Sequence, residues 1–143
     1  MAGSRKILIV DDERDLLDSL GTELTERGYA VLKAGDGIAA LEAARSDAPD
    51  LILLDLMLPH LDGYRILQLL KKDERYRKIP ILVITARANA EDWTLAMECG
   101  ADGCLTKPFR LDSLLDRIVA IVGTGTGSGS GSGDLSHGEA AAA

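Results

Sequence analysis

The sequence predicts an α/β protein, a doubly wound sheet of five parallel strands. One pattern occurs five times between residues 5 and 122: a short apolar run ends in polar residues or glycine, and an amphipathic helical stretch follows. Three of the runs are continuous, which is typical of central parallel strands buried on both faces. Alternation of strands and helices with connections of this length favours right-handed crossovers and helices on both faces of the sheet.

The five apolar runs are the expected strands. In chain order they are residues 7–10, 30–34, 51–54, 81–84 and 103–105. The runs at 7–10, 51–54 and 81–84 contain only apolar residues, so we place them at the centre of the sheet. The run at 103–105 is the weakest of the five.

The first three helices are indicated by apolar residues at helical spacing. Leucines at 16, 17, 20 and 24 define the first helix, which we expect to end at Gly28. Apolar residues at 38, 41, 43 and 44 define the second, with Pro49 beyond its end. Positions 64, 67 and 70 define the third, which stops before Pro80.

The last two helices follow the fourth and fifth strands. Asn89 is the expected N-cap of the fourth helix, with Asp92 in its first turn, where acidic side chains suit the helix dipole. Leucines at 111, 114 and 115 and an isoleucine at 118 define the fifth helix. A helix is therefore expected after each of the five strands.

The composition is that of a globular protein. Of the 143 residues, 46% are apolar and 27% are charged. The longest unbroken apolar runs contain four or five residues, far fewer than the ~20 that span a bilayer. The amino terminus is too short and too polar to be a secretory signal. We therefore expect a cytoplasmic protein with no membrane partner.

The charge balance argues against direct binding to nucleic acid. The chain has 16 basic and 23 acidic side chains and a net charge of −7, whereas affinity for polyphosphates depends on a lysine- and arginine-rich surface. We therefore expect no direct nucleic-acid partner. Two cysteines, Cys99 and Cys104, are too few for a disulfide framework or a structural zinc site. We interpret both as free thiols.

The composition changes at Gly123. Between residues 123 and 133 glycine occupies every odd position and threonine or serine every even one, which is typical of a flexible linker. We therefore divide the chain into one domain at 5–122 and a flexible tail at 123–143. The tail is either the start of a linker to a missing second domain or a tail added in cloning, and the sequence does not separate these.

Chemically active side chains stand where the predicted strands end. Asp11 and Asp12 follow the first strand, Asp55 the third, Thr85 the fourth and Lys107 the fifth. The carboxyl ends of parallel strands meet at one edge of a sheet, where the working crevice of such folds lies. We therefore expect two or three carboxylates, a hydroxyl and an ammonium group to meet there.

This set of groups suits phosphoryl transfer. Clustered carboxylates repel one another unless a cation lies among them, and an oxygen-only set with open positions suits Mg²⁺. A carboxylate also attacks phosphorus as a nucleophile, giving an aspartyl phosphate. Lys107 would neutralise phosphoryl charge, and the hydroxyl of Thr85 would donate a hydrogen bond to a phosphoryl oxygen.

Taken in order, these stretches resemble the receiver domain of two-component response regulators. The matching residues are ILIVDDE at 7–13, LLDLMLP at 53–59 with Asp62 and Gly63, ITA at 84–86, GAD at 100–102 and LTKPF at 105–109. The likeness covers about residues 5–122. It implies the flavodoxin-like receiver fold, with strand order 2-1-3-4-5. We interpret Gly63 as a loop residue that needs a free φ angle.

The resemblance assigns a role to each group at the predicted edge. It implies that Asp55 is the phosphoacceptor and that Lys107 pairs with the phosphate. Asp12 would ligate Mg²⁺ directly, and Asp11 through water or as a supporting acid. The family pattern adds the backbone carbonyl of Met57 as a third protein ligand.

The resemblance also implies a switch and its partners. Thr85 would move toward the phosphate on activation, and the surface near the fourth and fifth helices would change. The phosphodonor would be a sensor histidine kinase or a phosphotransfer protein. The changed surface would regulate a downstream protein, a missing output domain or a second copy of the chain. The likeness favours a cis peptide bond before Pro108, which would aim Lys107 into the crevice.

One position departs from the family pattern. Receivers usually carry tyrosine or phenylalanine three residues before the lysine, where this chain has Cys104. Thr85 and Cys104 therefore stand at the two switch positions of the family. A thiol cannot swing a ring into the space that Thr85 leaves, so we expect phosphorylation without coupling to an aromatic side chain. Trp93 either packs partly on the core or is an exposed interaction anchor, and Pro108 is a second candidate interaction residue.

Three functions compete. The first is a phosphorylation-controlled switch with no enzymatic activity beyond self-phosphorylation from small donors and autodephosphorylation. The second is a phosphorylation-independent interaction module, which the thiol at position 104 keeps open. The third is an aspartate-nucleophile phosphatase. Such enzymes usually need a second aspartate two residues after the nucleophile, where this chain has Met57, so the third is the weakest.

Overall fold

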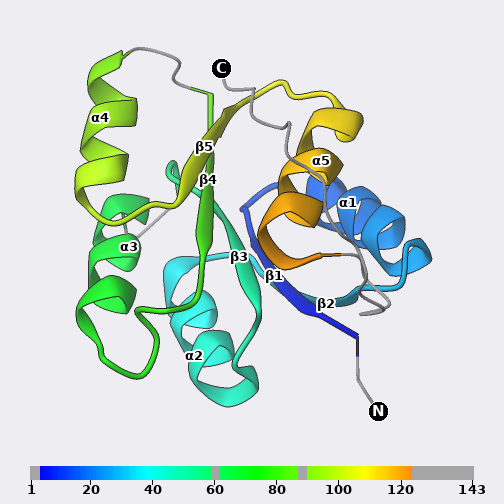
Figure 1. Ribbon diagram of the computed structural model, residues 1–143, viewed down its shortest axis with the longest axis horizontal. Coiled ribbons are helices and arrows are strands. Elements are labelled where there is room, and N and C mark those ends of the chain that lie inside the picture. Colours follow the sequence, from blue (N-terminus) through cyan, green and yellow to red (C-terminus); the bar gives the residue numbers. More distant parts are fainter. Residues whose placement is uncertain (1–3, 59–61, 87–89, 124–143) are drawn as a thin grey trace.

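The structure is a computed structural model that describes residues 4–58, 62–86 and 90–123. Within them lies one sheet of five parallel strands in the order β2-β1-β3-β4-β5, which confirms the predicted fold (Figure 1). The strands are β1 (Lys6–Val10), β2 (Ala30–Ala34), β3 (Leu51–Asp55), β4 (Ile81–Thr85) and β5 (Gly103–Thr106).

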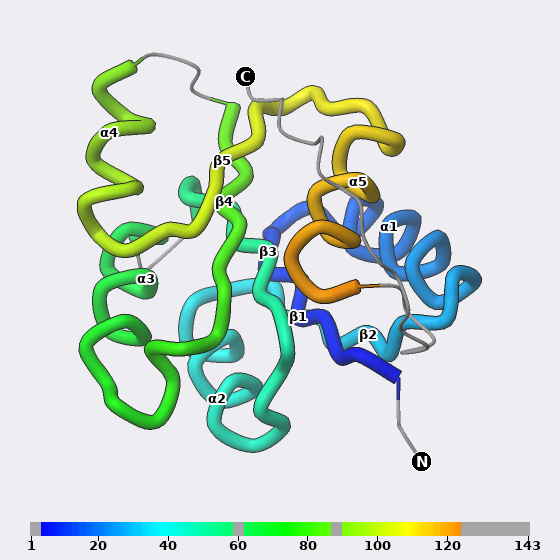
Figure 2. The backbone as a smooth tube through the Cα atoms, in the orientation of Figure 1, coloured from blue at the N-terminus to red at the C-terminus, as the bar shows by residue number. Residues whose placement is uncertain are grey.

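Five helices cover the two faces of the sheet. They are α1 (Arg14–Glu26), α2 (Gly37–Asp47), α3 (Gly63–Lys72), α4 (Ala90–Glu98) and α5 (Leu111–Val122). Helices α2, α3 and α4 lie on one face, and α1 and α5 lie on the other (Figure 1). The backbone trace follows each crossover from one strand to the next (Figure 2). Asn89, the expected N-cap of α4, lies outside the described residues.

Two hydrophobic clusters fill the space between the sheet and its helices. Successive side chains of a strand point to opposite faces. Along β1, Leu8 and Val10 belong to the cluster under α2, α3 and α4, whereas Ile7 and Ile9 belong to the cluster under α1 and α5. The same alternation holds in β3 and β4. The central strands are therefore buried on both faces, as their continuous apolar sequences predict.

The strands continue slightly beyond the apolar runs. Asp55 is the last residue of β3, Thr85 of β4 and Thr106 of β5. The parallel register pairs Asp55 with Ile84 and Thr85 with Thr106. These polar residues are thereby held in the rigid sheet and not in the loops that follow it.

The opposite edge of the sheet carries polar contacts made by two side chains, Tyr29 and Lys71. The hydroxyl of Tyr29 donates a hydrogen bond of 2.8 Å to the carbonyl of Gly123, directly after α5. The ammonium group of Lys71 donates to the carbonyls of Arg77 and Ile79 at 3.0 and 2.8 Å and to Asp102 at 3.0 Å. These contacts fasten the last turn of α5 and the segments that lead into β4 and β5.

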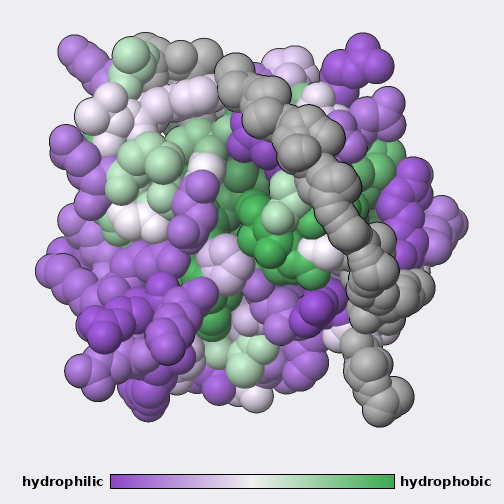
Figure 3. Space-filling model, viewed as in Figure 1, coloured by the Kyte–Doolittle hydropathy of each residue, from purple (hydrophilic) through white to green (hydrophobic). Residues whose placement is uncertain are grey.

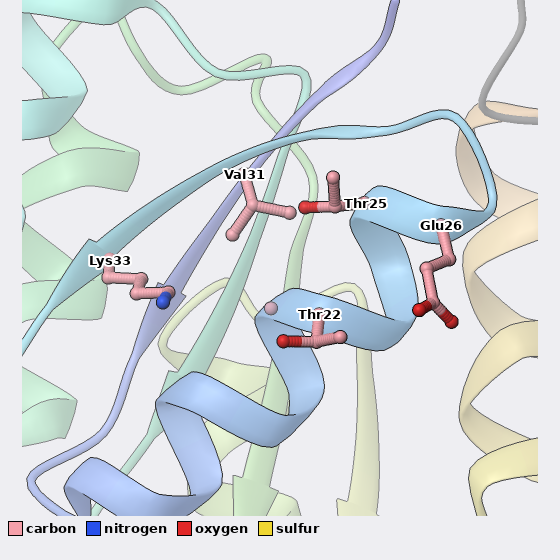
Figure 4. Close-up of a pocket in the computed structure, with 6 residues that line it drawn as sticks. Thr22, Thr25, Glu26, Val31 and Lys33 are labelled. Carbon is pink, nitrogen blue, oxygen red and sulfur yellow. The ribbon is translucent and has the colours of Figure 1, made fainter.

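A shallow pocket of about 320 Å³ lies between α1 and the edge strand β2 (Figure 4). Thr22 and Thr25 of α1 face Val31 and Lys33 of β2 across it. Gly21 leaves room for the Lys33 side chain, whose Cε would lie 2.7 Å from a methyl group at position 21. None of the predicted site residues lines this pocket.

The predicted tail is almost entirely outside the described part of the chain, which ends at Gly123. The proposed boundary between domain and tail therefore stays a prediction. Among the described helices, none has both the length and the apolar character that crossing a membrane requires.

Candidate functional site

The predicted site residues lie together at the carboxyl edge of the sheet. Asp11 and Asp12 follow β1, Asp55 ends β3, Thr85 ends β4, and Lys107 follows β5. In the sheet, β1 lies next to β3, β3 next to β4, and β4 next to β5. The strand order therefore brings residues separated by nearly the whole domain to one place.

Lys107 is the centre of this group. Its Nζ lies 2.7 Å from Oδ2 of Asp11 and 3.2 Å from Oδ2 of Asp55. A third acid, Glu13, places its Oε1 3.7 Å from the same nitrogen. One ammonium group thus bridges the ends of β1 and β3 and is surrounded by acidic oxygens.

Each buried carboxylate divides its two oxygens between Lys107 and its own loop. Oδ1 of Asp11 accepts a hydrogen bond of 2.9 Å from the backbone N–H of Glu13. Oδ1 of Asp55 accepts one of 2.9 Å from the backbone N–H of Met57. Both carboxylates are held at two points, so their orientation toward the crevice is fixed.

Burial changes the electrostatics of the pair. Asp11 and Asp55 expose only 2% and 4% of their surface. Burial raises the pKa of Asp55 above its ordinary 3.8, and the negative charge of Asp11 adds to the rise. The N–H of Met57 and the charge of Lys107 oppose it without cancelling it.

Lys107 responds in the opposite sense. Burial favours its neutral form, but the hydrogen bond to Asp11 and the charges of Asp55 and Asp11 outweigh that effect. The pKa of Lys107 is therefore raised above 10.5. The lysine remains a cation at neutral pH and compensates part of the acidic charge.

Asp12 completes a set of three acids that fits a divalent cation. One carboxylate oxygen from each of Asp11, Asp12 and Asp55 lies within 4.8 Å of the other two. Asp12 is exposed, whereas the other two are buried, so the set faces solvent on one side. Hard oxygen donors with an open side match the preference of Mg²⁺ for carboxylates and retained water.

Thr85 is buried at the end of β4, with 1% of its surface exposed. Its carbonyl accepts a hydrogen bond of 2.8 Å from the backbone N–H of Lys107. This contact ties the residue after β5 to the end of β4. The Lys107–Pro108 peptide bond is cis, as the resemblance implies, and Pro108 itself is exposed.

Cys104 and Trp93 lie on the α3 and α4 side of the sheet. Cys104 is buried in the cluster under these helices, and its burial raises the pKa of its thiol. Trp93 is half-buried on α4 and packs against the same cluster. The packing interpretation of Trp93 is therefore confirmed, whereas an interaction role for it stays a prediction.

The structure adds two residues to the site. The first is Glu13, which contacts Lys107. Its position directly after Asp11 and Asp12 is the sequence signal that could have found it. Gly63 is the second, and our interpretation of it as a loop residue with a special φ is wrong. It is the first residue of α3 without a left-handed φ, and a methyl group there would lie 2.5 Å from Cα of Leu56. Close packing, and not backbone freedom, requires glycine here.

Known proteins are similar to this chain in sequence and fold. Residues 7–119 match the family model described as the response regulator receiver domain. The DNA-binding dual master transcriptional regulator RpaA of Synechocystis sp. is 42% identical over 117 residues, which are 82% of this chain and 48% of RpaA. The chain spans about half the length of the curated relatives it matches.

Solved receiver structures are similar as well. Chemotaxis protein CheY4 of Vibrio cholerae has a TM-score of 0.79 at 29% identity, covering 83% of this chain and 99% of that chain. The BeF3-activated N-terminal receiver domain of Klebsiella pneumoniae RstA has a TM-score of 0.76 at 27% identity, covering 82% and 97%.

The expectation of no direct nucleic-acid partner is wrong. It is contradicted by RpaA, a relative that is named as DNA-binding. The argument from charge considered only the residues of this chain, and these correspond to about half of that protein. Acidic charge on one part of a protein does not determine what another part binds.

The family match covers nearly all of the strands and helices and every residue of the acidic edge, from Asp11 to Lys107. RpaA is 42% identical to this chain over the same region, and the solved receivers superpose on its fold with TM-scores of 0.76 and 0.79. The chain therefore belongs to the response regulator receiver domain family, the regulatory domains of two-component signalling.

Proposed function

We propose that this domain is a phosphoaccepting switch in a two-component phosphorelay, with Asp55 as the acceptor. The observation that supports this most directly is the bridge formed by Lys107. A single ammonium group contacts two buried carboxylates, Asp11 at 2.7 Å and Asp55 at 3.2 Å. A third acid, Asp12, lies beside them and is exposed to solvent. A buried acid, a fixed cation and an open metal-binding side are the parts that phosphoryl transfer needs.

In the transfer, a carboxylate oxygen of Asp55 attacks the phosphorus of the donor. The bond from phosphorus to the donor atom breaks, and that atom keeps the electron pair. The donor atom is an imidazole nitrogen in a histidine kinase or phosphotransfer protein, and an acyl oxygen in acetyl phosphate. Lys107 neutralises charge on the phosphoryl oxygens, and Thr85 donates its hydroxyl to one of them.

Asp12, Asp11 and the backbone carbonyl of Met57 would hold Mg²⁺ together with Asp55. The carboxylate oxygens of the three aspartates already lie within 4.8 Å of one another. The ion supplies positive charge that offsets the repulsion between the acids and the incoming phosphoryl group. Asp12 is the exposed member of the three aspartates, so it gives the ion a point of entry.

The output is a change of the surface formed by α4, β5 and α5. Hydrophobic residues gather over the middle of this side of the molecule, between α4 and α5 (Figure 3). Leu95 and Met97 of α4 and Val119 of α5 are large exposed apolar residues. We propose that this surface regulates a partner protein or an output domain. The BeF3-activated state of the RstA receiver supports a phosphate-responsive switch, and the DNA-binding relative RpaA supports control of transcription.

An independent enzymatic function has less support. Met57 stands two residues after Asp55 and offers no carboxyl group for acid catalysis, so repeated turnover of phosphate esters is not expected. An interaction module without phosphorylation is favoured by one observation, the buried thiol of Cys104 at the expected aromatic position. Incubation with acetyl phosphate, described next, separates the phosphoaccepting switch from the interaction module.

The test measures the intact mass of the full chain after incubation with acetyl phosphate, with and without Mg²⁺. One addition of about 80 Da is expected, and it should require both Mg²⁺ and Asp55. Asp55→Asn should take up nothing. Asp18→Asn is the matched control, because this aspartate is exposed on α1 and its side chain is 74% accessible. No addition to the folded wild type would instead support the interaction module.

A further inference from the structure

The first turn of α3 is seated directly on the end of the acceptor strand. A methyl group at Gly63 would lie 2.8 and 2.9 Å from the carbonyl oxygens of Leu56 and Asp55. The backbone N–H of Gly63 donates a hydrogen bond of 3.2 Å to the carbonyl of Leu56. There is no free space between the two segments. A displacement of the backbone at Asp55 and Leu56 must therefore carry the start of α3 with it.

The next residue reaches from α3 to α4. The hydroxyl of Tyr64 lies 3.2 Å from Oδ1 of Asp92 and 3.4 Å from its carbonyl oxygen. Asp92 is in the first turn of α4. The backbone N–H of Tyr64 is itself held by Oδ1 of Asp62 at 3.0 Å. A short chain of contacts thus runs from the acceptor to α4 through Gly63 and Tyr64.

Cys104 of β5 is less able than Tyr64 to influence the position of α4. Cys104 is buried in the cluster under α3 and α4, to which Ala96 of α4 also belongs. A cysteine side chain is shorter than that of tyrosine or phenylalanine and has no ring. Its rotation therefore displaces few neighbouring side chains. Tyr64, which packs against the same cluster, supplies both a ring and a hydroxyl from α3.

We propose that Tyr64 is a latch that holds the first turn of α4 in its resting position and is released when Asp55 is phosphorylated. The latch rests on the proposed function, since it is the phosphoryl group that opens it. The group enters beside the N–H of Met57, which now binds Asp55, and shifts the segment on which Gly63 is seated. Hydrogen bonds of 3.2 and 3.4 Å are near the limit of the interaction, so a small shift breaks them.

The expected size of the effect follows from the worth of one hydrogen bond. Loss of the Tyr64 hydroxyl should shift the equilibrium between resting and released α4 by roughly two- to tenfold toward release. Phosphorylation would then shift the equilibrium between resting and released α4 by a smaller amount than in the wild type. Chemistry at Asp55 should be unaffected, because the hydroxyl that the variant removes bonds to Asp92 of α4.

Trp93 makes this measurable, since it is the single tryptophan of the chain and stands next to Asp92 on α4. The experiment records Trp93 emission of the full chain before and after acetyl phosphate and Mg²⁺, and reads phosphoryl occupancy by intact mass in the same sample. The variant is Tyr64→Phe, which keeps the ring. Tyr76→Phe is the matched control, because Tyr76 packs against the same cluster from the segment after α3.

We expect Tyr64→Phe to be phosphorylated like the wild type. Its resting emission should already be displaced toward that of the phosphorylated wild type, and its response should be smaller, whereas Tyr76→Phe behaves like the wild type. In the Asp92→Ala background the effect of Tyr64→Phe should shrink, because the two residues act through one contact. A full Trp93 response in Tyr64→Phe, or an undiminished effect in that background, would overturn the latch.

The mass reading separates this inference from the function on which it depends. If the wild type takes up the phosphoryl group but Trp93 emission does not change, the latch is wrong and the switch chemistry stands. If the wild type takes up no phosphoryl group at all, the proposed function is wrong, and the latch falls with it.

Discussion

Lys107 is the residue on which the charge balance of the site depends. Its ammonium group lies within 3.7 Å of oxygens from Asp11, Glu13 and Asp55, so one positive charge faces three negative ones. The two buried acids are fastened by their own loops and cannot turn away from each other. The ligand-free site therefore stores electrostatic repulsion, which added positive charge relieves.

Asp55→Asn should raise the stability of the ligand-free protein at neutral pH, by a few degrees in Tm. The raised pKa of Asp55 means that its ionised form is disfavoured in the folded state relative to the unfolded state. Asparagine has the same size without the charge. Below the raised pKa the folded wild type binds a proton, so the advantage of the variant should shrink as pH falls toward 3.8.

Urea unfolding of the wild type and Asp55→Asn between pH 7 and pH 4 measures this difference. Titrating groups that do not interact with Asp55 contribute equally to both proteins and cancel. A variant that is less stable than the wild type at pH 7 would mean that the contact with Lys107 outweighs the cost of burying the Asp55 charge.

Lys107→Gln should destabilise the domain by about 1–3 kcal/mol at pH 7, because two buried carboxylates lose their cation. The raised pKa of Lys107 means that its contribution is fully present below 10.5 and is lost only as pH rises through the folded-state value. Acidification should partly rescue the variant, since protonated Asp55 no longer needs the cation.

The matched control is Lys33→Gln. Lys33 forms an ion pair of 3.1 Å with Asp18, but both side chains are largely exposed, so the loss should stay within about 0.5 kcal/mol. Urea titrations of the two variants side by side provide the comparison. Equal losses in both would show that burial of the site adds nothing to the value of its ion pairs.

At the scale of elements, the contact between β3 and α3 is the tightest constraint near the site. Gly63→Ala should destabilise the domain by about 1–3 kcal/mol, because the new methyl group meets backbone atoms of Leu56 and Asp55 that cannot rotate away. Gly35→Ala is the control, since its nearest neighbour is a carbonyl oxygen 4.0 Å away. It should be neutral or slightly stabilising.

Chemical denaturation gives the stability of both glycine variants, and intact mass after acetyl phosphate gives their phosphoryl uptake. Gly63→Ala should lose uptake as well as stability, because the shift displaces Asp55. If its stability matches that of Gly35→Ala, the start of α3 is not rigidly seated on the acceptor strand.

The sequence was sufficient to predict the strands and the acids at their ends, because both follow from local rules. Continuous apolar runs identify β1, β3 and β4, and a polar residue directly after such a run must lie at the carboxyl edge. Contacts between helices do not follow from such rules. Nothing in the spacing of Tyr64 and Asp92 indicates that a hydroxyl of α3 reaches α4, and the packing at Gly63 has no periodic signature.

At the scale of the whole molecule, folding and metal binding should be linked. Mg²⁺ that binds only the folded acids stabilises the domain by about 1.4 kcal/mol at ten times its Kd. Thermal unfolding should therefore shift upward as Mg²⁺ is added at constant ionic strength. Asp12→Asn should abolish most of the shift with little loss of basal stability, because Asp12 is exposed. An Asp12→Asn protein that responds like the wild type would place the ion elsewhere.

The absence of a nucleic-acid partner was the expectation that sequence reasoning got wrong. The net charge and the missing basic stripe are properties of this chain alone, which corresponds to about half of a protein like RpaA. The acidic edge, in contrast, is complete within one domain, so its residues could be predicted from this chain alone.

The hydrogen bond from Tyr29 to Gly123 fixes the position of the residue that directly follows α5. Tyr29 immediately precedes β2, so this anchor stands at the amino edge, and Asp55 stands at the carboxyl edge. A tether attached after Gly123 therefore pulls on the end of α5 and the loop before β2, at the far side from the phosphoacceptor. A partner joined after Gly123 is therefore attached on the opposite edge of the sheet from the one that a phosphodonor must approach.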